Sequence, residues 1–225
     1  VLNVARVAKE YGASTFVLVS TDKAVSPTSV MGATKRMAEM AIRELGADER
    51  THFVAVRFGN VLGSNASVVP IFQQQIEAGG PVTVTDVAAE RYFMTAYEAA
   101  GLILVAAAIG NNREIYLLDM GTPVNIDSLA RTMIELSGLI PGKDILIEYT
   151  GLKPGEKLTE VLSSGEEELG TTEHKKLMLV RNSGPGFADL DQFDEFINSV
   201  KNFSNREVKE ELRNIVPDYK IDGIN

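Results

Sequence analysis

The chain has 225 residues, of which 44% are hydrophobic and 24% charged, and it carries a formal net charge of −9. This length is enough for one large domain, or for one domain with a small appendage. The acidic composition argues against a nucleic-acid surface, and no apolar run reaches the roughly 20 residues of a membrane span. With no cysteine and only His52 and His174 as histidines, we predict neither a disulfide nor a metal site.

Strand-like and helix-like segments alternate in the first part of the chain. Residues 2–11 carry apolar residues at helical spacing, and residues 15–20 form an apolar run that predicts a strand buried on both faces. The polar loop TDKAVSPT leads to a predicted helix at 29–46, and a second buried strand follows at 53–58. This alternation predicts an α/β fold with a doubly wound parallel sheet.

The pattern is less regular in the rest of the chain. Helices are predicted at 67–78, 96–109 and 126–137, and strands at 82–85, 115–120 and 145–149. From residue 187 on, the sequences FADLDQFDEF and NFSNRE belong to two predicted amphipathic helices of acidic character.

The sequence lacks one motif that a dinucleotide-binding fold needs. No G-x-G-x-x-G stands at a strand-to-helix turn, where such a motif would bind the pyrophosphate of the cofactor. The chain also begins VLNVARVAKEYGAS, without an initiator methionine and inside an apolar helical stripe. We therefore expect a fragment of a longer protein, in which an upstream part holds the glycine motif.

The loop after the first predicted strand is the first candidate site. Residues 20–23 are polar, and they follow a strand at the carboxyl edge of the sheet, where open α/β sheets bind their ligands. Met31 and Lys35 are four residues apart and share a helix face. On this pattern alone, a simple turn at Thr21 and Asp22 with a solvated Lys35 is the favoured interpretation. We assign Arg36, Arg43 and Glu44 to a solvated face of the same helix.

Four separated motifs occur in order along the chain: VSTDKAVSPTSVMGATKRMAE, VRFGNVLGSNASVVPIFQQQIEAGGPVTVT, ERYFMT and GLKPGEKLTE. Together they closely resemble the extended short-chain dehydrogenase/reductase enzymes of bacterial polysaccharide biosynthesis. Within these, the chain is similar to the CapD-like UDP-N-acetylglucosamine 4,6-dehydratases that carry methionine in place of the catalytic tyrosine. The resemblance covers about residues 1–180.

The resemblance implies a Rossmann-like fold, of which the chain is the C-terminal portion, with a smaller α/β substrate-binding region. It implies NAD or NADP as the cofactor and a UDP-sugar as the substrate. It also implies a cytoplasmic homo-oligomer, and it leaves open whether the whole protein has an N-terminal membrane anchor.

The resemblance assigns three catalytic roles to the loop. Asp22 is expected to protonate the departing C6 hydroxyl of the sugar, and Lys23 to remove the proton from C5. Thr21 is expected near O4, where it relays the proton that tyrosine takes in other members. This chemistry requires a base at O4, a base at C5 and an acid at O6.

Three further residues are assigned to the cofactor side of the same site. Lys35 matches the lysine that holds the nicotinamide ribose, and Ser20 is expected to bind the cofactor beside it. Met31 cannot transfer a proton, so we expect its thioether to pack against the nicotinamide or the sugar.

The resemblance also implies a site for the diphosphate of the substrate. Asn60 matches an asparagine that hydrogen-bonds the diphosphate, although a glycine and asparagine turn is the alternative interpretation. Ser67 and Val68 begin a predicted helix, whose free N–H groups suit an anion. Arg91 matches the arginine that clamps the diphosphate, and Lys153 stands where a second phosphate-binding arginine often stands.

The uridine is expected to contact two segments. Glu156 matches the acid that binds the ribose hydroxyls, and Val82 and Val84 are candidate walls for the uracil. The predicted division is therefore a C-terminal part of the dinucleotide-binding domain at 1–65 and a nucleotide-sugar-binding region at 66–180, from which some segments return to the main sheet. Residues 181–225 are expected to form an acidic helical tail.

The sequence thus predicts a lyase: an NAD(P)-dependent dehydratase that converts UDP-N-acetylglucosamine to the 4-keto-6-deoxy sugar for surface polysaccharide, with this fragment alone inactive. A UDP-sugar 4-epimerase is the alternative in the same superfamily, and it needs no acid at C6. A nucleotide-sugar-binding module without catalysis is a third possibility. Neither alternative requires Asp22 and Lys23 together.

Overall fold

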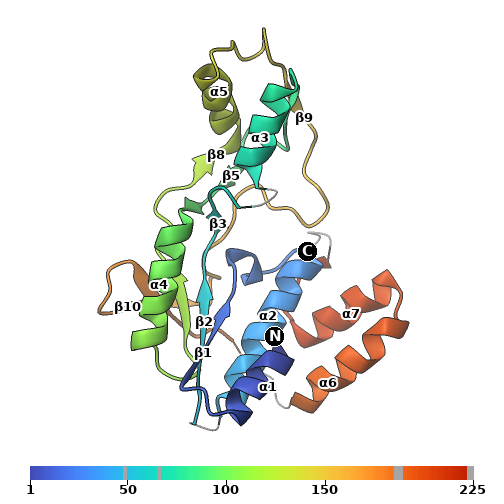
Figure 1. Ribbon diagram of the computed structural model, residues 1–225. Helices are drawn as coiled ribbons and strands as arrows, with labels where there is room; N and C mark the ends of the chain where they lie inside the picture. Colours follow the sequence, from blue (N-terminus) through green and yellow to red (C-terminus); the bar gives the residue numbers. More distant parts are fainter. Residues whose placement is uncertain (48–49, 65–66, 185–189, 222–225) are drawn as a thin grey trace. The chain divides into compact units, whose positions relative to one another are not determined.

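The computed structural model describes residues 1–47, 50–64, 67–184 and 190–221. The chain folds into two compact units, which we call unit 1 and unit 2 (Figure 1). Unit 1 comprises Val1–Phe58, Ala100–Asp119 and Val161–Asn225, and unit 2 comprises Gly59–Ala99 and Met120–Glu160. The functional domain boundaries placed at residues 65 and 180 from the sequence stay predictions.

Unit 1 is built on a five-stranded sheet. Its strands are, in spatial order, β1 (Thr15–Val19), β2 (His52–Arg57), β7 (Ile115–Leu118), β11 (Leu177–Arg181) and β10 (Glu168–Thr171). The first three are parallel, and β11 runs antiparallel to both β7 and β10. The two apolar runs predicted as parallel strands are confirmed as β1 and β2. Burial is confirmed for β2 but not for β1, which lies at the edge of the sheet and is mostly half-buried. The β10–β11 hairpin was not predicted.

Helices cover both faces of this sheet, as expected for a doubly wound fold. Helices α1 (Leu2–Glu10) and α2 (Val30–Leu45) share a hydrophobic cluster with Phe53 and Ala55 of β2. The opposite face of β2 meets the end of α4 (Ala96–Ile109), because a Cβ on the following Gly110 would lie 3.0 Å from Val54. The predicted α/β fold class is confirmed.

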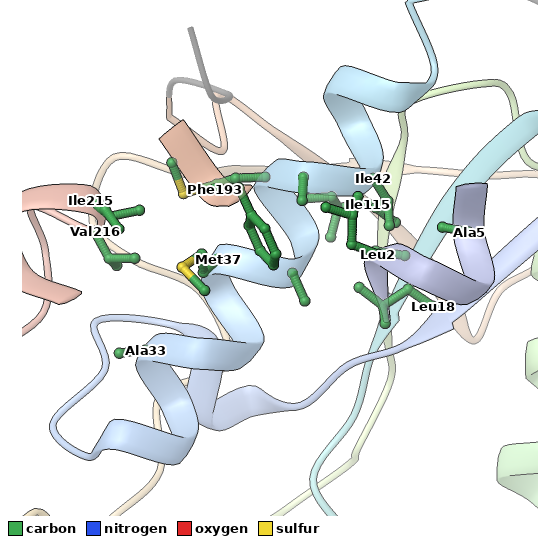
Figure 2. Packing of buried hydrophobic residues seen from close by; sticks show 14 of the residues in the cluster. Leu2, Ala5, Leu18, Ala33, Met37, Ile42, Ile115, Phe193, Ile215 and Val216 are labelled. Carbon is green, nitrogen blue, oxygen red and sulfur yellow. The ribbon is translucent and has the colours of Figure 1, made fainter. Parts of the chain in front are cut away.

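The largest core of unit 1 surrounds α2 (Figure 2). Helices α6 (Leu190–Ser199) and α7 (Asn205–Ile215) are joined by the short η2 (Val200–Asn202), and both contact α2. Phe193 and Ile215 pack from these helices onto Met37. The two amphipathic helices predicted near the C-terminus are confirmed, although residues 187–189 of the first lie outside the described residues.

Unit 2 is a smaller α/β arrangement with its own core. Helices α3 (Val68–Glu77) and α5 (Ile126–Leu136) pack on the parallel pair β4 (Val82–Val84) and β9 (Ile147–Tyr149). Two short strand pairs complete it: β3 (Asn60–Val61) with β6 (Phe93–Met94), and β5 (Glu90–Arg91) with β8 (Val124–Asn125). In the part of the chain that the structure describes, no helix has the length and apolarity to cross a membrane.

Candidate functional site

The first candidate site lies where β1 ends and α2 begins, in unit 1. The 3₁₀ helix η1 (Asp22–Ala24) follows β1, and the side chain of Ser29 caps α2 by accepting a hydrogen bond from the backbone N–H of Gly32 at 3.1 Å. A Cβ on Gly32 would lie 2.2 Å from the carbonyl oxygen of Lys23. Glycine at this position therefore allows the first turn of α2 to approach the backbone of η1.

The predicted catalytic residues Thr21, Asp22 and Lys23 lie together. The Thr21 hydroxyl donates to Oδ1 of Asp22 at 2.9 Å, and the Lys23 ammonium donates to the same oxygen at 3.0 Å. Asp22 is 0% exposed, and its Oδ2 has no hydrogen-bond partner among the described residues. The loop thus joins a hydroxyl, a buried carboxylate and an amine by direct hydrogen bonds. Asp22 has no exposed surface in this arrangement, so its predicted contact with the sugar stays a prediction.

Met31 and Lys35 extend from α2 beside this loop. The Met31 side chain is 48% exposed, so it is available to pack against a bound molecule. The Lys35 ammonium donates to the carbonyl oxygen of Val19 at 3.1 Å and so lies at the carboxyl end of β1. This is the edge at which open α/β sheets bind their ligands.

Ser20 differs from its predicted use. Its side chain is buried, and its hydroxyl donates to Oε1 of Glu39 at 2.6 Å. That hydroxyl is therefore already engaged inside the protein, and the cofactor-binding role of Ser20 remains a prediction without support from this arrangement.

A buried cluster of ion pairs surrounds Glu39, the residue that accepts the Ser20 hydroxyl hydrogen. This cluster was not predicted from the sequence. Arg57 of β2 forms two hydrogen bonds with Glu39 of α2, at 2.8 and 2.7 Å, and also pairs with Glu167 at 2.8 Å. Arg36 pairs with Glu39 at 3.1 Å and donates to the carbonyl oxygen of Ser183. The assignment of Arg36 to a solvated face is wrong, because these long-range partners bury it.

The electrostatics of this cluster follow from its burial. Burial by itself would raise the pKa of Glu39, but the charge and hydrogen bonds of Arg57, together with Arg36 and Ser20, bring that pKa below its usual value. Burial would likewise lower the pKa of Arg57, and its two carboxylate partners raise it instead. Both groups are therefore ionised at neutral pH.

The second candidate site is a pocket of about 500 Å³ in unit 2. Four of the residues predicted to bind the substrate diphosphate line this pocket, namely Asn60, Ser67, Val68 and Arg91. The lining residues are Gly59, Asn60, Val61, Ser64, Ser67, Val68, Arg91 and Phe93. The hydroxyl of Ser67, at the N-cap of α3, is buried and has no hydrogen-bond partner among the described residues.

Arg91 and Glu156 form an ion pair at the side of this pocket. The Arg91 guanidinium donates to Glu156 at 2.7 Å and to the carbonyl oxygens of Glu90 and Leu158 at 2.7 and 2.9 Å. The second oxygen of Glu156 accepts from the backbone N–H of Lys153 at 3.2 Å. The two predicted ligand-binding residues of opposite charge thus contact each other, and Lys153 joins them through its backbone while its side chain is exposed.

Val82 and Val84 are placed differently from the prediction. Both side chains are almost completely buried in the core of unit 2, among Phe72, Ile76 and Ile134. They have no exposed surface for a uracil ring, so the predicted role as base walls has no support in this arrangement.

Comparisons with known proteins bear on the family of the chain. Residues 1–182 match the family model described as polysaccharide biosynthesis protein. The capsular polysaccharide biosynthesis protein CapD of Staphylococcus aureus is 57% identical over 166 residues, which are 73% of this chain and 28% of CapD. The chain therefore spans little more than a quarter of this curated relative.

Solved structures agree with this assignment. The X-ray structure of Pen from Bacillus thuringiensis matches with a TM-score of 0.72 and 31% identity, over 90% of this chain and 67% of Pen. A dTDP-glucose 4,6-dehydratase from Bacillus anthracis in complex with NAD matches with a TM-score of 0.62 over 72% of this chain and 57% of that chain, and its 17% identity shows a shared fold alone. The chain corresponds to the C-terminal part of that fold. The resemblance inferred from the four motifs is confirmed, and the chain belongs to the polysaccharide biosynthesis protein family.

Proposed function

We propose that the chain supplies the catalytic loop and the nucleotide-sugar site of an NAD(P)-dependent 4,6-dehydratase that acts on a UDP-N-acetyl-hexosamine, with UDP-N-acetylglucosamine as the expected substrate. The observation that carries the proposal is the direct contact of Asp22 with both Lys23 and Thr21 at the end of a parallel strand. Dehydration needs a base that removes the proton of C5 and an acid that protonates the hydroxyl on the neighbouring C6. Lys23 and Asp22 are adjacent residues that could fill these two roles.

The proposed chemistry gives each loop residue one proton to move. Thr21 relays the proton of the C4 hydroxyl as C4 becomes a ketone, and over the cycle that proton replaces the one that Asp22 gives up. The ketone makes the C5 proton acidic. Lys23 removes that C5 proton, and Asp22 gives a proton to the C6 hydroxyl, which leaves as water with formation of the C5–C6 double bond. NAD, when bound, would supply the redox chemistry by taking up the hydride of C4 and giving it to C6. Lys23 returns a proton to C5.

The contact between Lys23 and Asp22 suits this exchange. In the proposed reaction Asp22 gives a proton to the C6 hydroxyl, and Lys23 takes a proton from C5 and returns one to it. A distance of 3.0 Å allows a proton to cross between them without a water.

Of the residues predicted to contact the cofactor, some fit their predicted roles and others do not. Lys35 lies at the carboxyl end of β1, where it would hold the nicotinamide ribose, and the half-exposed Met31 offers an apolar surface to the ring or the sugar. Ser20 fits less well, since Glu39 accepts its hydroxyl hydrogen. The residues that would cradle the pyrophosphate are not part of these 225 residues, because the chain has no glycine motif of that kind.

The pocket of unit 2 is the proposed diphosphate site. The N-terminus of α3, the guanidinium of Arg91 and the Ser67 hydroxyl, which has no partner among the described residues, supply donors. Anions bind favourably at such helix ends. Glu156 lies within 2.7 Å of Arg91, so the ribose hydroxyls and the diphosphate would be bound by neighbouring groups.

A UDP-sugar 4-epimerase is the second candidate, because it shares the oxidation at C4. It would need Thr21 and Lys35 but no acid at C6. The buried and directly paired Asp22 therefore favours the dehydratase. A binding module without catalysis would need only the pocket of unit 2.

A chimera tests these three possibilities together. This chain replaces the matching 67% of Pen, so that the remaining part of Pen completes the fold. With UDP-N-acetylglucosamine, a dehydratase gives a product that is lighter by one water and carries a 4-keto group, as mass spectrometry detects. A product of unchanged mass with inverted C4 would show an epimerase. Binding of UDP by a folded chimera that forms no product would support the binding module.

A further inference from the structure

We infer that Glu39 and Arg57 are positioning residues for the loop of Thr21, Asp22 and Lys23, and that Ser20 is the link through which they act. The catalytic consequence of this inference rests on the proposed function. The structural part of the inference, that a buried ion pair holds the loop in place, does not rest on the proposed function.

The loop is first tied to the neighbouring strand by its backbone. The N–H of Ser20 donates to the carbonyl oxygen of Val56 at 2.8 Å, and the N–H of Asp22 donates to that of Phe58 at 3.1 Å. Arg57 lies between these two acceptors in the chain. A displacement of Arg57 would therefore move both anchors of the loop.

The side chains add a second connection. Oε1 of Glu39 accepts from the Ser20 hydroxyl at 2.6 Å and from Nε of Arg57 at 2.8 Å. One carboxylate oxygen thus joins the start of the loop to the end of β2. All three side chains are buried, so water does not compete for these bonds.

Helix α2 makes two side-chain contacts with the end of β1 and the start of the loop. Lys35 and Glu39 are four residues apart on one face of the helix, and they bind consecutive residues of the chain: Lys35 donates to the carbonyl oxygen of Val19, and Glu39 accepts from Ser20. The helix therefore fixes the end of β1 at two successive points.

Energetics favour a positioning role over a purely stabilising one. A buried ion pair repays its desolvation only with good geometry, and well-packed apolar residues of similar volume often stabilise a protein at least as much. The directional hydrogen bonds are what apolar residues cannot supply. They fix the direction of the Ser20 side chain and, through it, the backbone that presents Asp22 and Lys23.

Removing the link alone tests the inference without opening the ion pair. Ser20→Ala deletes the hydroxyl and leaves Glu39 and Arg57 paired. In the 225-residue chain, hydrogen exchange should become about 10-fold to 100-fold faster at the amide of Asp22, which is the scale of one hydrogen bond to a charged group. The amides of β7, at the centre of the sheet, should keep their exchange rates.

Thr51→Val is the matched control. Thr51 is also buried in unit 1, immediately before β2, and its hydroxyl has no hydrogen-bond partner among the described residues. This variant should leave the Asp22 amide unchanged. An unchanged Asp22 amide in Ser20→Ala, or an equal acceleration throughout the sheet, would overturn the inference.

Kinetics of the chimera with Pen then separate positioning from binding. Ser20→Ala should lower kcat about 10-fold to 100-fold, the order of loss expected from a small misplacement of reacting groups, with an unchanged KM for the UDP-sugar. A raised KM with unchanged kcat would contradict the positioning role. An unmodified chimera that is inactive would count against the proposed function only, because the exchange measurement decides the positioning of the loop by itself.

Discussion

Gly32→Ala should destabilise unit 1, although alanine normally favours a helix over glycine by about 1 kcal/mol. The new Cβ would lie 2.2 Å from the carbonyl oxygen of Lys23, whereas Cβ atoms do not approach other atoms below 3.0 Å. The first turn of α2 and η1 must therefore separate by about 0.8 Å, from 2.2 to 3.0 Å. Overpacking of this kind costs about 1 to 3 kcal/mol, and because the obstacle is backbone we expect a net loss of about 1 to 2 kcal/mol.

The assay is urea denaturation of the 225-residue chain, and Gly101→Ala is the matched control. Gly101 lies within α4, and a Cβ there would meet nothing within 4 Å, so this variant should gain up to about 1 kcal/mol. In the chimera with Pen, the displaced loop should also lower kcat by about 100-fold, since a misplacement near 1 Å can have that effect. A Gly32→Ala chain as stable as the parent, with full turnover, would refute the close approach of α2 to the loop.

Three further substitutions separate the proposed roles. In the chimera, Asp22→Asn should slow loss of the C6 hydroxyl by about 100-fold to 10,000-fold while reduced cofactor accumulates, and a variant that never reduces the cofactor would place Asp22 in the oxidation step. Met31→Leu keeps volume and apolarity, so kcat should change less than about threefold, and a dead variant would show that the thioether does more than pack. Arg91→Lys in the 225-residue chain should weaken UDP binding in calorimetry by about 1 to 3 kcal/mol, and unchanged affinity would exclude Arg91 as the diphosphate anchor.

The sequence predicted the part of the fold that local pattern controls. Strands β1 and β2 are apolar on both faces, and this composition predicts parallel strands. β2 is buried as this composition suggests, whereas β1 is at the edge of the sheet in this chain. The β10–β11 hairpin escaped prediction because β10 is a four-residue edge strand, ELGT, which has a glycine and no apolar alternation. The small strand pairs of unit 2 have two residues per strand and leave no periodic signal at all.

The long-range contacts of charged residues in the candidate site could not be predicted from local sequence pattern either. The roles of Asp22 and Lys23 were predicted from the resemblance of the surrounding motif to a known family, because the local pattern alone favoured a simple turn. Arg36 was assigned to solvent because a charged residue near the polar side of an amphipathic helix usually lies there. Its partner at Ser183 is 147 residues away, and the partner of Arg57 at Glu167 is 110 residues away, so no local pattern reports either contact.

The two candidate sites are built in physically different ways, and the difference matches what each is proposed to do. The loop of unit 1 is held by Glu39 and Arg57, both fully buried, because acid and base catalysis requires groups fixed within about 0.5 Å. In unit 2, the side chains of Arg91 and Glu156 remain 12% and 24% exposed, so an incoming ligand can reach their ion pair. If the diphosphate takes the donors of Arg91, the carboxylate of Glu156 is released towards the ribose hydroxyls. A single exchange of partners would then create both contacts that the family resemblance implies, with a net affinity reduced by the ion pair that is lost.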